Sequence, residues 1–587
     1  METVTRQRAS RRRLAIAILM TFAIVGVFVV RLVDIQIVKA ADFNTESFDK
    51  RAIETPVVAP RGEIVDTNGV VLADSVTRYD ITASPRNAGE FNRREDDGSI
   101  SKVTVLQAVT EIAALTGTTA NDLLLAVTAD PTSDWAMLVK GVDIETFRAI
   151  RDLGIPWIYA QPQQHRTYPA GAVAGNLVGF VGTDGPQNGL EATEDSCLAS
   201  VDGVSTYERG ADGVRLPGST VTTREAVPGG TLQLTIDRDL QWYVQQAIAE
   251  QAVALGAESA MAGVVRVSDG HLMALADYPA VDPNNVNGTD IPFYGSRAFS
   301  YMFEPGSIMK AITASMLVNE GAASPTTRVT VPGIWHTPDG ARIRDSAPHG
   351  DMRWTLTGVL EQSSNVGMSM LGTRLKAGVR YDYLRKYGFG EATPIHFQGE
   401  ASGILASNWN TQQNYDTTYG QGVSVTFAQM LSAYQAIANG GKQVPLTLVE
   451  SCTAPDGTVT STPSTDTEQI ITPKAAATTV AMLESVVTGG WLSSQLSIPG
   501  YRIAAKTGTA EVALPTGGYG NDFIVSVAGI APAENPEYVV IVTYVKPHIM
   551  KSSAAAAPTF RKIMTQVLKT YRVPPSTKPG PGYPTTW

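Results

Sequence analysis

The sequence predicts an α/β domain that follows a strand-rich region and a single membrane-spanning helix. Three observations support this: an uncharged apolar run near the N-terminus, strand-like segments separated by Gly and Pro up to about residue 230, and strands around a long helical middle beyond it. The chain has 587 residues, of which 43% are hydrophobic, and this is enough for several folded domains.

Composition narrows the class of function before any motif is considered. The formal net charge of −10 argues against nucleic-acid binding through a broad basic surface. Two cysteines are too few for a disulfide framework or a Cys-rich metal site, and we expect neither a metal ion nor a cofactor. The six histidines are scattered and no Gly-x-Ser-x-Gly motif accompanies them, so a Ser-His-Asp triad is not expected.

The N-terminus reads as a retained signal anchor. Arginines between residues 6 and 13 precede the uncharged run Leu14–Val30, which forms about 25 Å of helix, and Leu32 and Val33 can extend it. We therefore predict a cytoplasmic tail over 1–13 and a transmembrane helix over 14–33, in the cell membrane, with the bulk of the chain outside. A cleaved signal peptide is the alternative, but the run is longer than the usual hydrophobic core of one.

The region 34–230 is predicted to be a separate domain of mixed strands and loops, rich in Gly and Pro. Arg61–Leu72 has the pattern of two strands around an Asn68-Gly69 turn, which is a strong hairpin signal. The charged stretch Asn92–Ser101 is predicted to be a solvated loop.

A second domain is predicted over 231–572. Gly229–Ile236 reads as a strand, and Asp237 is suited to cap the amphipathic helix that follows. Met261–Val267 and Leu272–Ala276 read as two strands around a turn.

The end of the chain continues this α/β pattern. Tyr538–Val545 is a nearly continuous apolar run, typical of a buried strand, and a helix with one apolar face follows it over 560–568. Residues 573–587 are rich in Pro and are predicted to be a flexible tail.

A serine and a lysine three residues apart form the first candidate catalytic pair. Ser307 and Lys310 follow a Pro-Gly loop end and lie on one face of the helix expected there. Serine is a weak nucleophile that needs a neighbouring base, and a lysine kept neutral by burial can serve. The Ser-x-x-Lys spacing alone is weak, because it also occurs at Ser47 and Ser99, in polar segments.

Two later motifs strengthen this pair. Ser363-Ser364-Asn365 offers a hydroxyl and an amide, which can relay a proton and bind a substrate backbone. Lys506-Thr507-Gly508-Thr509 is expected after a strand over 501–505. Its cation and hydroxyls can hold a carboxylate, and its glycine lets a substrate backbone approach closely.

The three motifs together resemble the signature of penicillin-binding proteins and serine β-lactamases. Ser364, where the β-lactamase form has Asp, favours the penicillin-binding proteins. Further segments resemble class B of that family: Arg61–Ala73, Arg166–Gly171, Gly189–Glu191, Asp212–Gly213, Tyr419–Gly422 and Ala438–Gly441. With one anchor and this length, the chain is most similar to the cell-division transpeptidases of the FtsI type.

Two departures concern the subfamily rather than the nucleophile. Thr67 replaces the usual Arg, and Val527-Ala528-Gly529 stands where many relatives have Phe-Val-Gly.

The resemblance implies a non-catalytic pedestal of the dimerisation type over 34–230 and a transpeptidase domain of the β-lactamase-like fold over 231–572. It also implies a role for each motif residue. Ser307, Lys310, Ser363, Asn365 and Lys506 would be catalytic, and Thr507, Gly508 and Thr509 would bind substrate. The implied reaction partners are peptidoglycan stem peptides and β-lactam antibiotics. The implied protein partners are a polytopic FtsW-type glycosyltransferase and other division proteins. No glycosyltransferase domain is expected within this chain.

Several alternatives stay open at this point. The same fold carries β-lactamases and β-lactam sensors, an elongation-type transpeptidase would share the motifs, and a catalytically silent scaffold of the division machinery is a third class. The anchor and the long pedestal favour a synthase. Cys197 and Cys452 lie outside the cytoplasm in this topology and could pair, which the sequence does not decide.

Overall fold

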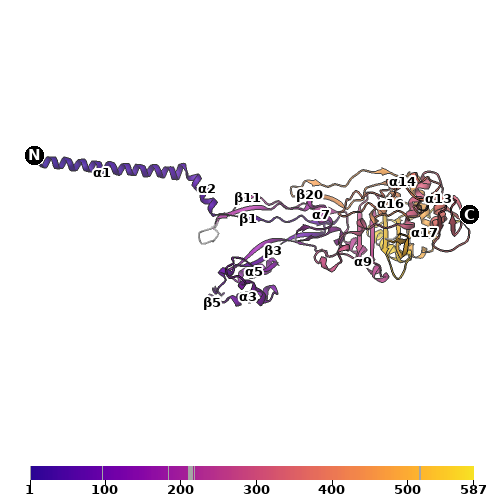
Figure 1. Cartoon of the computed structure of the whole chain (residues 1–587), viewed down its shortest axis with the longest axis horizontal. Coiled ribbons are helices and arrows are strands. Elements are labelled where there is room, and N and C mark those ends of the chain that lie inside the picture. Colours follow the sequence, from indigo (N-terminus) through magenta and orange to yellow (C-terminus); the bar gives the residue numbers. More distant parts are fainter. Residues whose placement is uncertain (1, 96, 183, 209–215, 217, 515–516) are drawn as a thin grey trace. The chain divides into compact units, whose positions relative to one another are not determined.

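The computed structural model describes residues 2–95, 97–182, 184–208, 216, 218–514 and 517–587 (Figure 1). The chain divides into two compact units. One comprises Met1–Ala59 with Ser200–Pro228, and the other comprises Pro60–Ala199 with Gly229–Trp587. The region 34–230, predicted as one pedestal, therefore contributes to both units.

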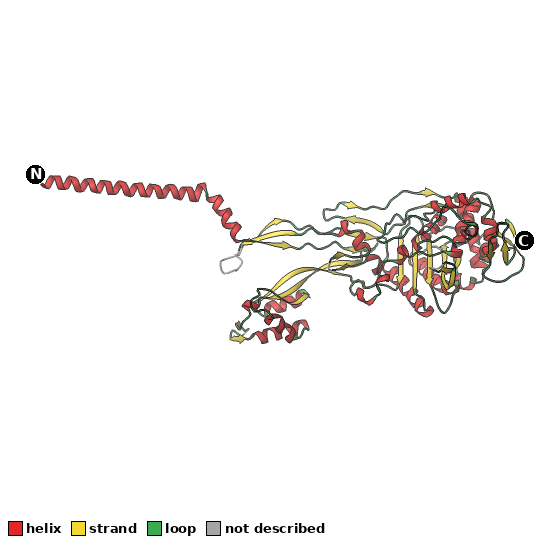
Figure 2. Cartoon of the chain, viewed as in Figure 1, coloured by secondary structure: helices red, strands yellow, loops and turns green. Residues whose placement is uncertain are grey.

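The first unit begins with helix α1, Glu2–Val33, followed by a short π-helix over Asp34–Val38 and by α2, Ala40–Arg51 (Figure 2). Within this region Arg11–Val38 is long and apolar enough to cross a membrane, and its most apolar 18-residue window has a mean hydropathy of 2.6. Its most apolar window is 0% buried against the rest of the described chain, unlike the core helix of a soluble protein. The predicted span 14–33 lies inside this range.

A three-stranded antiparallel sheet completes the first unit. Its strands are β1 (Ala52–Val57), β10 (Gly203–Glu208) and β11 (Val221–Arg224), with β10 in the middle. The predicted motif Asp212–Gly213 lies outside the described residues.

The second unit starts with the predicted hairpin. Strands β2 (Ile64–Val65) and β3 (Val71–Ala83) pair antiparallel on either side of the Asn68-Gly69 turn. The long β3 also pairs with β6 (Ala136–Val142) and β7 (Ile158–Thr167). Helices α3 (Val105–Thr116), α4 (Ala120–Thr128) and α5 (Ile144–Asp152) share one apolar core with these strands.

The charged stretch 92–101 differs from the predicted solvated loop. It forms most of a hairpin, with strands β4 (Phe91–Arg94) and β5 (Ile100–Val103). The guanidinium of Arg93 lies 2.7 Å from the carboxylate of Glu111 on α3, so part of the charge is used in an ion pair between elements.

A disulfide ties two parts of the second unit together. Cys197 in α8 (Asp195–Leu198) is bonded to Cys452 in β20 (Val449–Thr453), 255 residues apart in the chain. Strand β12 (Thr231–Leu234) lies between β2, which runs parallel to it, and β20, which runs antiparallel. The pairing that the sequence left open is therefore present.

A five-stranded antiparallel sheet forms the centre of the region after residue 230. The strand order is β14-β13-β25-β24-β23 among the described residues. The strands are β13 (Ser259–Arg266), β14 (Leu272–Tyr278), β23 (Ala504–Ala513), β24 (Tyr519–Ala531) and β25 (Tyr538–Val545). The predicted strands 261–267, 272–276 and 538–545 are confirmed, and β25 is buried along its whole length because helices cover both faces.

The helices on the two faces belong to separate apolar cores. One face packs on α9 (Arg238–Leu255) and α19 (Ala557–Thr570), and the Asp237 side chain caps α9 as predicted. The other face packs on α16 (Phe427–Ala438) and α17 (Pro473–Thr488). The same apolar core also contains α11 (Met309–Asn319), α12 (Leu356–Glu361) and α13 (Asn365–Gly372). Helices α9, α13, α16 and α17 are labelled in Figure 1, and Figure 2 draws the strands of the sheet in yellow and the helices around it in red.

The Pro-rich segment 573–587 differs from the predicted flexible tail. The Tyr501 hydroxyl donates to Val573 O, and the backbone N–H of Ser576 donates to Gly500 O. Tyr583 packs on the larger core, and Thr586 forms a β-bridge with Trp354. Composition favours flexibility here, but specific backbone hydrogen bonds to distant parts of the fold hold the segment in place.

Candidate active site

Ser307 lies in a tight turn immediately before α11. A single 3₁₀ turn, Gly306–Ile308, carries it, and its side chain is partly exposed while both neighbours are buried. Gly306 has a φ of +56°, which favours glycine, and its N–H donates to Gly420 O at 2.9 Å. The Tyr434 hydroxyl of α16 donates to Ile308 O at 2.8 Å. The turn is therefore held from two sides while the serine stays accessible.

Lys310 lies one turn further along and is fully buried. Its Nζ donates to Asn365 Oδ1 at 2.7 Å and to the backbone carbonyl of Ser363, and lies 3.4 Å from Ser363 Oγ. Burial lowers the pKa of Lys310 to about 7, against the opposing effect of the Asp345 carboxylate. A neutral amine is therefore accessible at physiological pH, which is what a general base requires.

Ser363 occupies an unusual backbone conformation between α12 and α13. Its φ is +58°, a region that costs free energy for a residue with a side chain and that clusters at functional sites. Ser364, the next residue, caps α13 by accepting a hydrogen bond from Gly367 N. In this conformation the Ser363 hydroxyl accepts a hydrogen bond from Lys506 Nζ at 2.8 Å.

Lys506 is the second fully buried lysine of the site. Besides Ser363, its Nζ donates to Thr507 O at 3.0 Å. Burial, together with the charge of Lys310, lowers the pKa of Lys506 well below its ordinary value. Two buried amines thus converge on one hydroxyl, from helix α11 and from strand β23.

The last motif lies within strand β23, which differs from the predicted strand that ends at residue 505. Lys506 and Thr507 pair with Ala528 and Val527 of β24, the positions at which the sequence departs from many class B relatives. Antiparallel pairing with β24 continues to residue 513 and includes the motif in the sheet.

Gly508 packs directly against the turn that carries Ser307. A Cβ on Gly508 would lie 3.0 Å from Ile308 Cγ2, so the absence of a side chain allows the close approach. Thr507 is buried, whereas Thr509 is exposed and its hydroxyl accepts a hydrogen bond from Ser553 N at 3.2 Å. The contacts of Lys506 with Ser363, of Lys310 with Ser363 and Asn365, and of Gly508 with the Ser307 turn therefore bring the three motifs together.

Asp345 is a site residue that sequence reasoning missed. Its carboxylate accepts hydrogen bonds from the Ser364 hydroxyl at 2.6 Å and from the backbone N–H groups of Asn365 and Val366. His349 Nε2 lies 2.9 Å from the same carboxylate. A carboxylate at the N-terminus of α13 is favoured by the free N–H groups there. No sequence signal marks Asp345, because it follows a short strand with no motif around it.

The ring of Tyr419 adjoins Lys310, and two carboxylates lie close to Tyr419. The ring centre of Tyr419 lies 6.0 Å from Lys310 Nζ, and the Tyr419 hydroxyl donates to Asp416. Glu304 accepts from Gly422 N at 2.8 Å and from the Tyr519 hydroxyl at 3.0 Å. Tyr419 could have been found, because it belongs to the Tyr419–Gly422 segment, but the two carboxylates carry no sequence signal.

The other two Ser-x-x-Lys sequences lie on other elements. Ser47 is in α2, and Ser99 is in the turn between β4 and β5. Their lysines, Lys50 and Lys102, are exposed and pair with glutamates. Within the described ranges, no group of three or more His, Cys, Asp or Glu side chains is placed to hold a metal ion.

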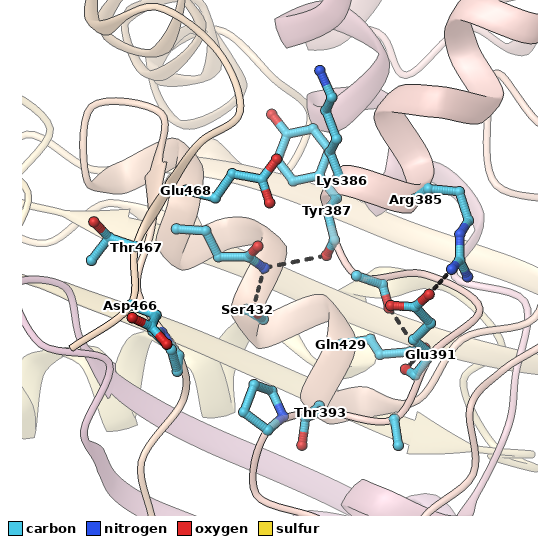
Figure 3. Close-up of a pocket in the computed structure, with 15 residues that line it drawn as sticks. Arg385, Lys386, Tyr387, Glu391, Thr393, Gln429, Ser432, Asp466, Thr467 and Glu468 are labelled. Carbon is cyan, nitrogen blue, oxygen red and sulfur yellow. Dashed lines mark hydrogen bonds and ion pairs between the residues drawn. The ribbon is translucent and has the colours of Figure 1, made fainter. Parts of the chain in front are cut away.

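The cavity shown in Figure 3 is separate from the motif residues. It has a volume of about 340 Å³ and is lined by the end of α14 (Ala377–Lys386), by Gln429 and Ser432 of α16, and by residues 466–468. Arg385 and Glu391 form an ion pair at its edge. None of the eight predicted site residues lines it, so the candidate site rests on the converging motifs and not on this cavity.

Comparison with known proteins agrees with this geometry. A model of the penicillin binding protein transpeptidase domain matches residues 260–565, and a model of the penicillin-binding protein dimerisation domain matches 56–234. Penicillin-binding protein PbpB of Mycolicibacterium smegmatis is 34% identical over 586 residues, covering 95% of this chain and 90% of that protein. Peptidoglycan D,D-transpeptidase FtsI of Escherichia coli is 30% identical, covering 91% of this chain and 88% of the relative.

A solved structure extends the likeness to three dimensions. The crystal structure of penicillin binding protein 3 from Mycobacterium tuberculosis, complexed with aztreonam, has a TM-score of 0.69 and 29% sequence identity, and covers 91% of this chain and 100% of that one. The resemblance predicted from the motifs is confirmed. The chain therefore belongs to the penicillin-binding protein transpeptidase family, with a dimerisation domain ahead of its transpeptidase domain.

Proposed function

We propose that this protein is a D,D-transpeptidase that cross-links peptidoglycan stem peptides through a Ser307 acyl-enzyme, in septal cell-wall synthesis, and that β-lactams inhibit it by acylating Ser307. The observation that carries the proposal is the convergence of two buried lysines on the Ser363 hydroxyl beside the Ser307 turn. The names of the relatives PbpB and FtsI support the division role, and the aztreonam complex of a relative supports β-lactam binding.

In the acylation step, neutral Lys310 takes the proton of the Ser307 hydroxyl while Oγ attacks the carbonyl carbon of the penultimate D-Ala. The bond to the terminal D-Ala breaks, and the leaving amine receives a proton from the Ser363 hydroxyl. Lys310 then returns to Ser363 the proton that it took from Ser307, while Lys506 holds the Ser363 oxygen by a hydrogen bond, so Lys310 is neutral again for the second step. The backbone N–H groups of Ser307 and Thr509 form the oxyanion hole, which is worth roughly 3–4 kcal/mol per donor in comparable enzymes. The product is an ester between Ser307 and the donor peptide.

In the second step, an amine of a neighbouring stem peptide attacks the ester carbonyl. Ser307 Oγ leaves with its electron pair and regains a proton that originates from the attacking amine, through Lys310. Asn365 binds the backbone amide of the donor, and Thr507 and Thr509 hold its terminal carboxylate beside Gly508. The position of Asn365 Oδ1, 2.7 Å from Lys310 Nζ, supports a shared role for the two residues.

The membrane topology and protein partners belong to the same proposal. The N-terminal arginines lie in the cytoplasm, α1 spans the cell membrane, and the rest of the first unit and the whole second unit face outward. A polytopic FtsW-type glycosyltransferase is the partner that supplies nascent strands, since this chain's two matched domains cover the dimerisation and transpeptidase functions alone.

Labelling with a fluorescent penicillin tests the proposal. We expect wild-type protein to become labelled and to stay labelled for hours, and Ser307→Ala to remain unlabelled. Ser99→Ala is the matched control, because it removes the serine of another Ser-x-x-Lys sequence. Label that is lost within seconds would indicate a β-lactamase, and a folded wild-type protein without label would indicate a silent scaffold.

Depletion in the native cell separates a division role from an elongation role. Loss of a septal enzyme gives cells that grow without dividing, and loss of an elongation enzyme gives rounded cells. Complementation with Ser307→Ala shows whether the chemistry, and not the presence of the chain alone, is required.

A further inference from the structure

The last fifteen residues of the chain, 573–587, form what we call the C-terminal strap. The strap follows α19 and crosses the second unit to the strand pair β15 (Arg328–Val331) and β18 (Met352–Thr355). At its end, Thr355 N donates to Thr585 O at 3.0 Å, and the Thr355 hydroxyl donates to Pro584 O at 2.6 Å. A Cβ on Gly358 would lie 1.9 Å from Thr585 O, so the backbone of the strap approaches α12 as closely as only glycine allows.

Trp587 fixes the end of the strap on this strand pair. Its indole Nε1 donates to Trp354 O at 3.1 Å and to Val329 O at 3.4 Å. The guanidinium carbons of Arg328 and Arg353 lie 5.2 and 5.5 Å from the ring centre, which is within the range of cation–π attraction. Backbone carbonyls of β15 and β18 and the guanidinium groups of Arg328 and Arg353 thus all contact the Trp587 side chain.

The strand that binds Trp587 also supports the middle catalytic motif. The Trp354 side chain is buried, and its ring centre lies 5.2 Å from that of His349. His349 in turn binds the Asp345 carboxylate, which accepts hydrogen bonds from Ser364 and from the backbone of Asn365. The contacts therefore run without interruption from the strap to the motif.

Along the chain, strand β18 is followed by helix α12 and then by the Ser363–Asn365 motif. Thr355, held by the strap, caps α12 by accepting from Gly358 N. Helix α12 then leads into Ser363, whose N–H donates to Leu360 O and whose φ is +58°. Because Ser363 occupies a costly conformation, its geometry depends on support from its surroundings.

We propose that the C-terminal strap holds the Ser363–Asn365 motif in its reactive geometry, and that Trp587 is a positioning residue acting through Trp354, His349 and Asp345. The inference rests on the proposed transpeptidase function. It assigns a role to a segment that contains none of the three motifs.

The test compares acylation rates of the full-length chain in detergent, with a fluorescent penicillin as the probe. We expect Trp587→Ala to be acylated about three- to tenfold more slowly, with unchanged final stoichiometry at Ser307 and an unchanged apparent affinity for the penicillin. Trp587→Phe keeps a ring near the two guanidinium groups but loses the indole N–H that donates to Trp354 O, so we expect it to recover only part of the rate. Trp242→Ala, which removes a half-exposed tryptophan of α9, is the matched control and keeps the wild-type rate.

A double variant tests the route of the effect. If Trp587 acts through His349, then Trp587→Ala combined with His349→Ala is no slower than the slower single variant. Effects that multiply would overturn the route, and a wild-type rate in Trp587→Ala would overturn the proposal as a whole.

A substitute variant and the labelling of wild-type protein cover the remaining outcomes of this experiment. If Trp587→Ala does not fold, as judged by its thermal midpoint, Arg328→Gln with Arg353→Gln removes the two flanking cations instead. A wild-type rate in that variant also overturns the proposal. Absence of label on wild-type protein overturns the proposed function and this inference together, whereas equal rates overturn the inference alone.

Discussion

Lys506 Nζ lies 2.8 Å from the Oγ of Ser363, and Lys310 Nζ lies 3.4 Å from the same oxygen. Both lysines are fully buried, so two full positive charges at this spacing are unfavourable. Burial lowers the pKa of both lysines, so the neutral form of at least one of them is favoured, and the Ser363 hydroxyl contacts both amines. This arrangement lets Lys310 accept a proton while Lys506 supports the Ser363 hydroxyl, which donates a proton to the leaving amine.

The acylation rate is expected to depend on pH through Lys310. Burial lowers the pKa of Lys310 to about 7, and only the neutral amine can act as base. The rate constant for acylation by a fluorescent penicillin should therefore fall about tenfold per pH unit below pH 7 and level off above it. Stopped-flow or quenched labelling between pH 5 and 9 measures this profile.

The thermal midpoint over the same pH range is the control for that profile, because a loss of folded protein would also lower the rate. A rate that stays constant down to pH 5 would exclude Lys310 as a base with the expected pKa.

Removing the buried amine is expected to abolish activity and stabilise the fold. The folded pKa of Lys310, about 7, lies below its ordinary value of 10.5, so between these pH values the unfolded chain binds more protons. The free energy of unfolding therefore rises with pH across that range, and the amine costs stability near pH 7. Lys310→Met should raise the Tm by about 2 °C or more at pH 7 while labelling is lost.

The difference in Tm between Lys310→Met and wild type should become smaller as the pH is raised from 7 toward 10. A variant that is less stable than wild type at pH 7 would contradict this account, since it would mean that hydrogen bonds to Asn365 and Ser363 outweigh the cost of burial.

Gly508 is expected to be essential for the position of Ser307. In Gly508→Ala the new Cβ would lie 3.0 Å from Ile308 Cγ2, so the Ser307 turn must move by a few tenths of an ångström. We expect the acylation rate to fall about tenfold or more, because small displacements of a nucleophile are costly. Gly378→Ala in α14 is the matched control, since a Cβ there meets nothing within 4 Å. Equal rates in the two variants would show that the turn tolerates the shift.

Local sequence patterns predicted the parts of this fold that are determined locally. The Asn68-Gly69 hairpin, the Asp237 cap of α9 and the apolar strand β25 each follow from neighbouring residues. The eight site residues were predicted because the three motifs, spread over some 200 residues, have a known resemblance. Neither propensity nor periodicity showed that they would meet.

The features that were missed depend on contacts between distant parts of the chain. Asp345 lies 19 residues before Ser364, and Thr355 lies 229 residues before Pro584, with no pattern that links either pair. The left-handed backbone conformation of Ser363 could not be predicted from the residue type, because the surrounding fold and not the local preference of serine stabilises it. The Pro-rich composition predicted a flexible segment over residues 573–587. This prediction was wrong because composition carries no information on hydrogen bonds to a distant strand.

The disulfide between Cys197 and Cys452 is expected to contribute to stability more than to catalysis. It closes a loop of 255 residues and lies beside the pairing of β12 with β20, whereas the motif residues lie on other elements. Cys197→Ala combined with Cys452→Ala should lower the free energy of unfolding by about 2–4 kcal/mol. The acylation rate at 25 °C should stay within about twofold of wild type, because the Ser307 turn is held by Gly420 and Tyr434. Denaturant unfolding of wild type with and without reductant is the matched measurement, and it should reproduce the effect of the double variant. A large loss of acylation rate in folded protein would instead show that the disulfide helps to position the site.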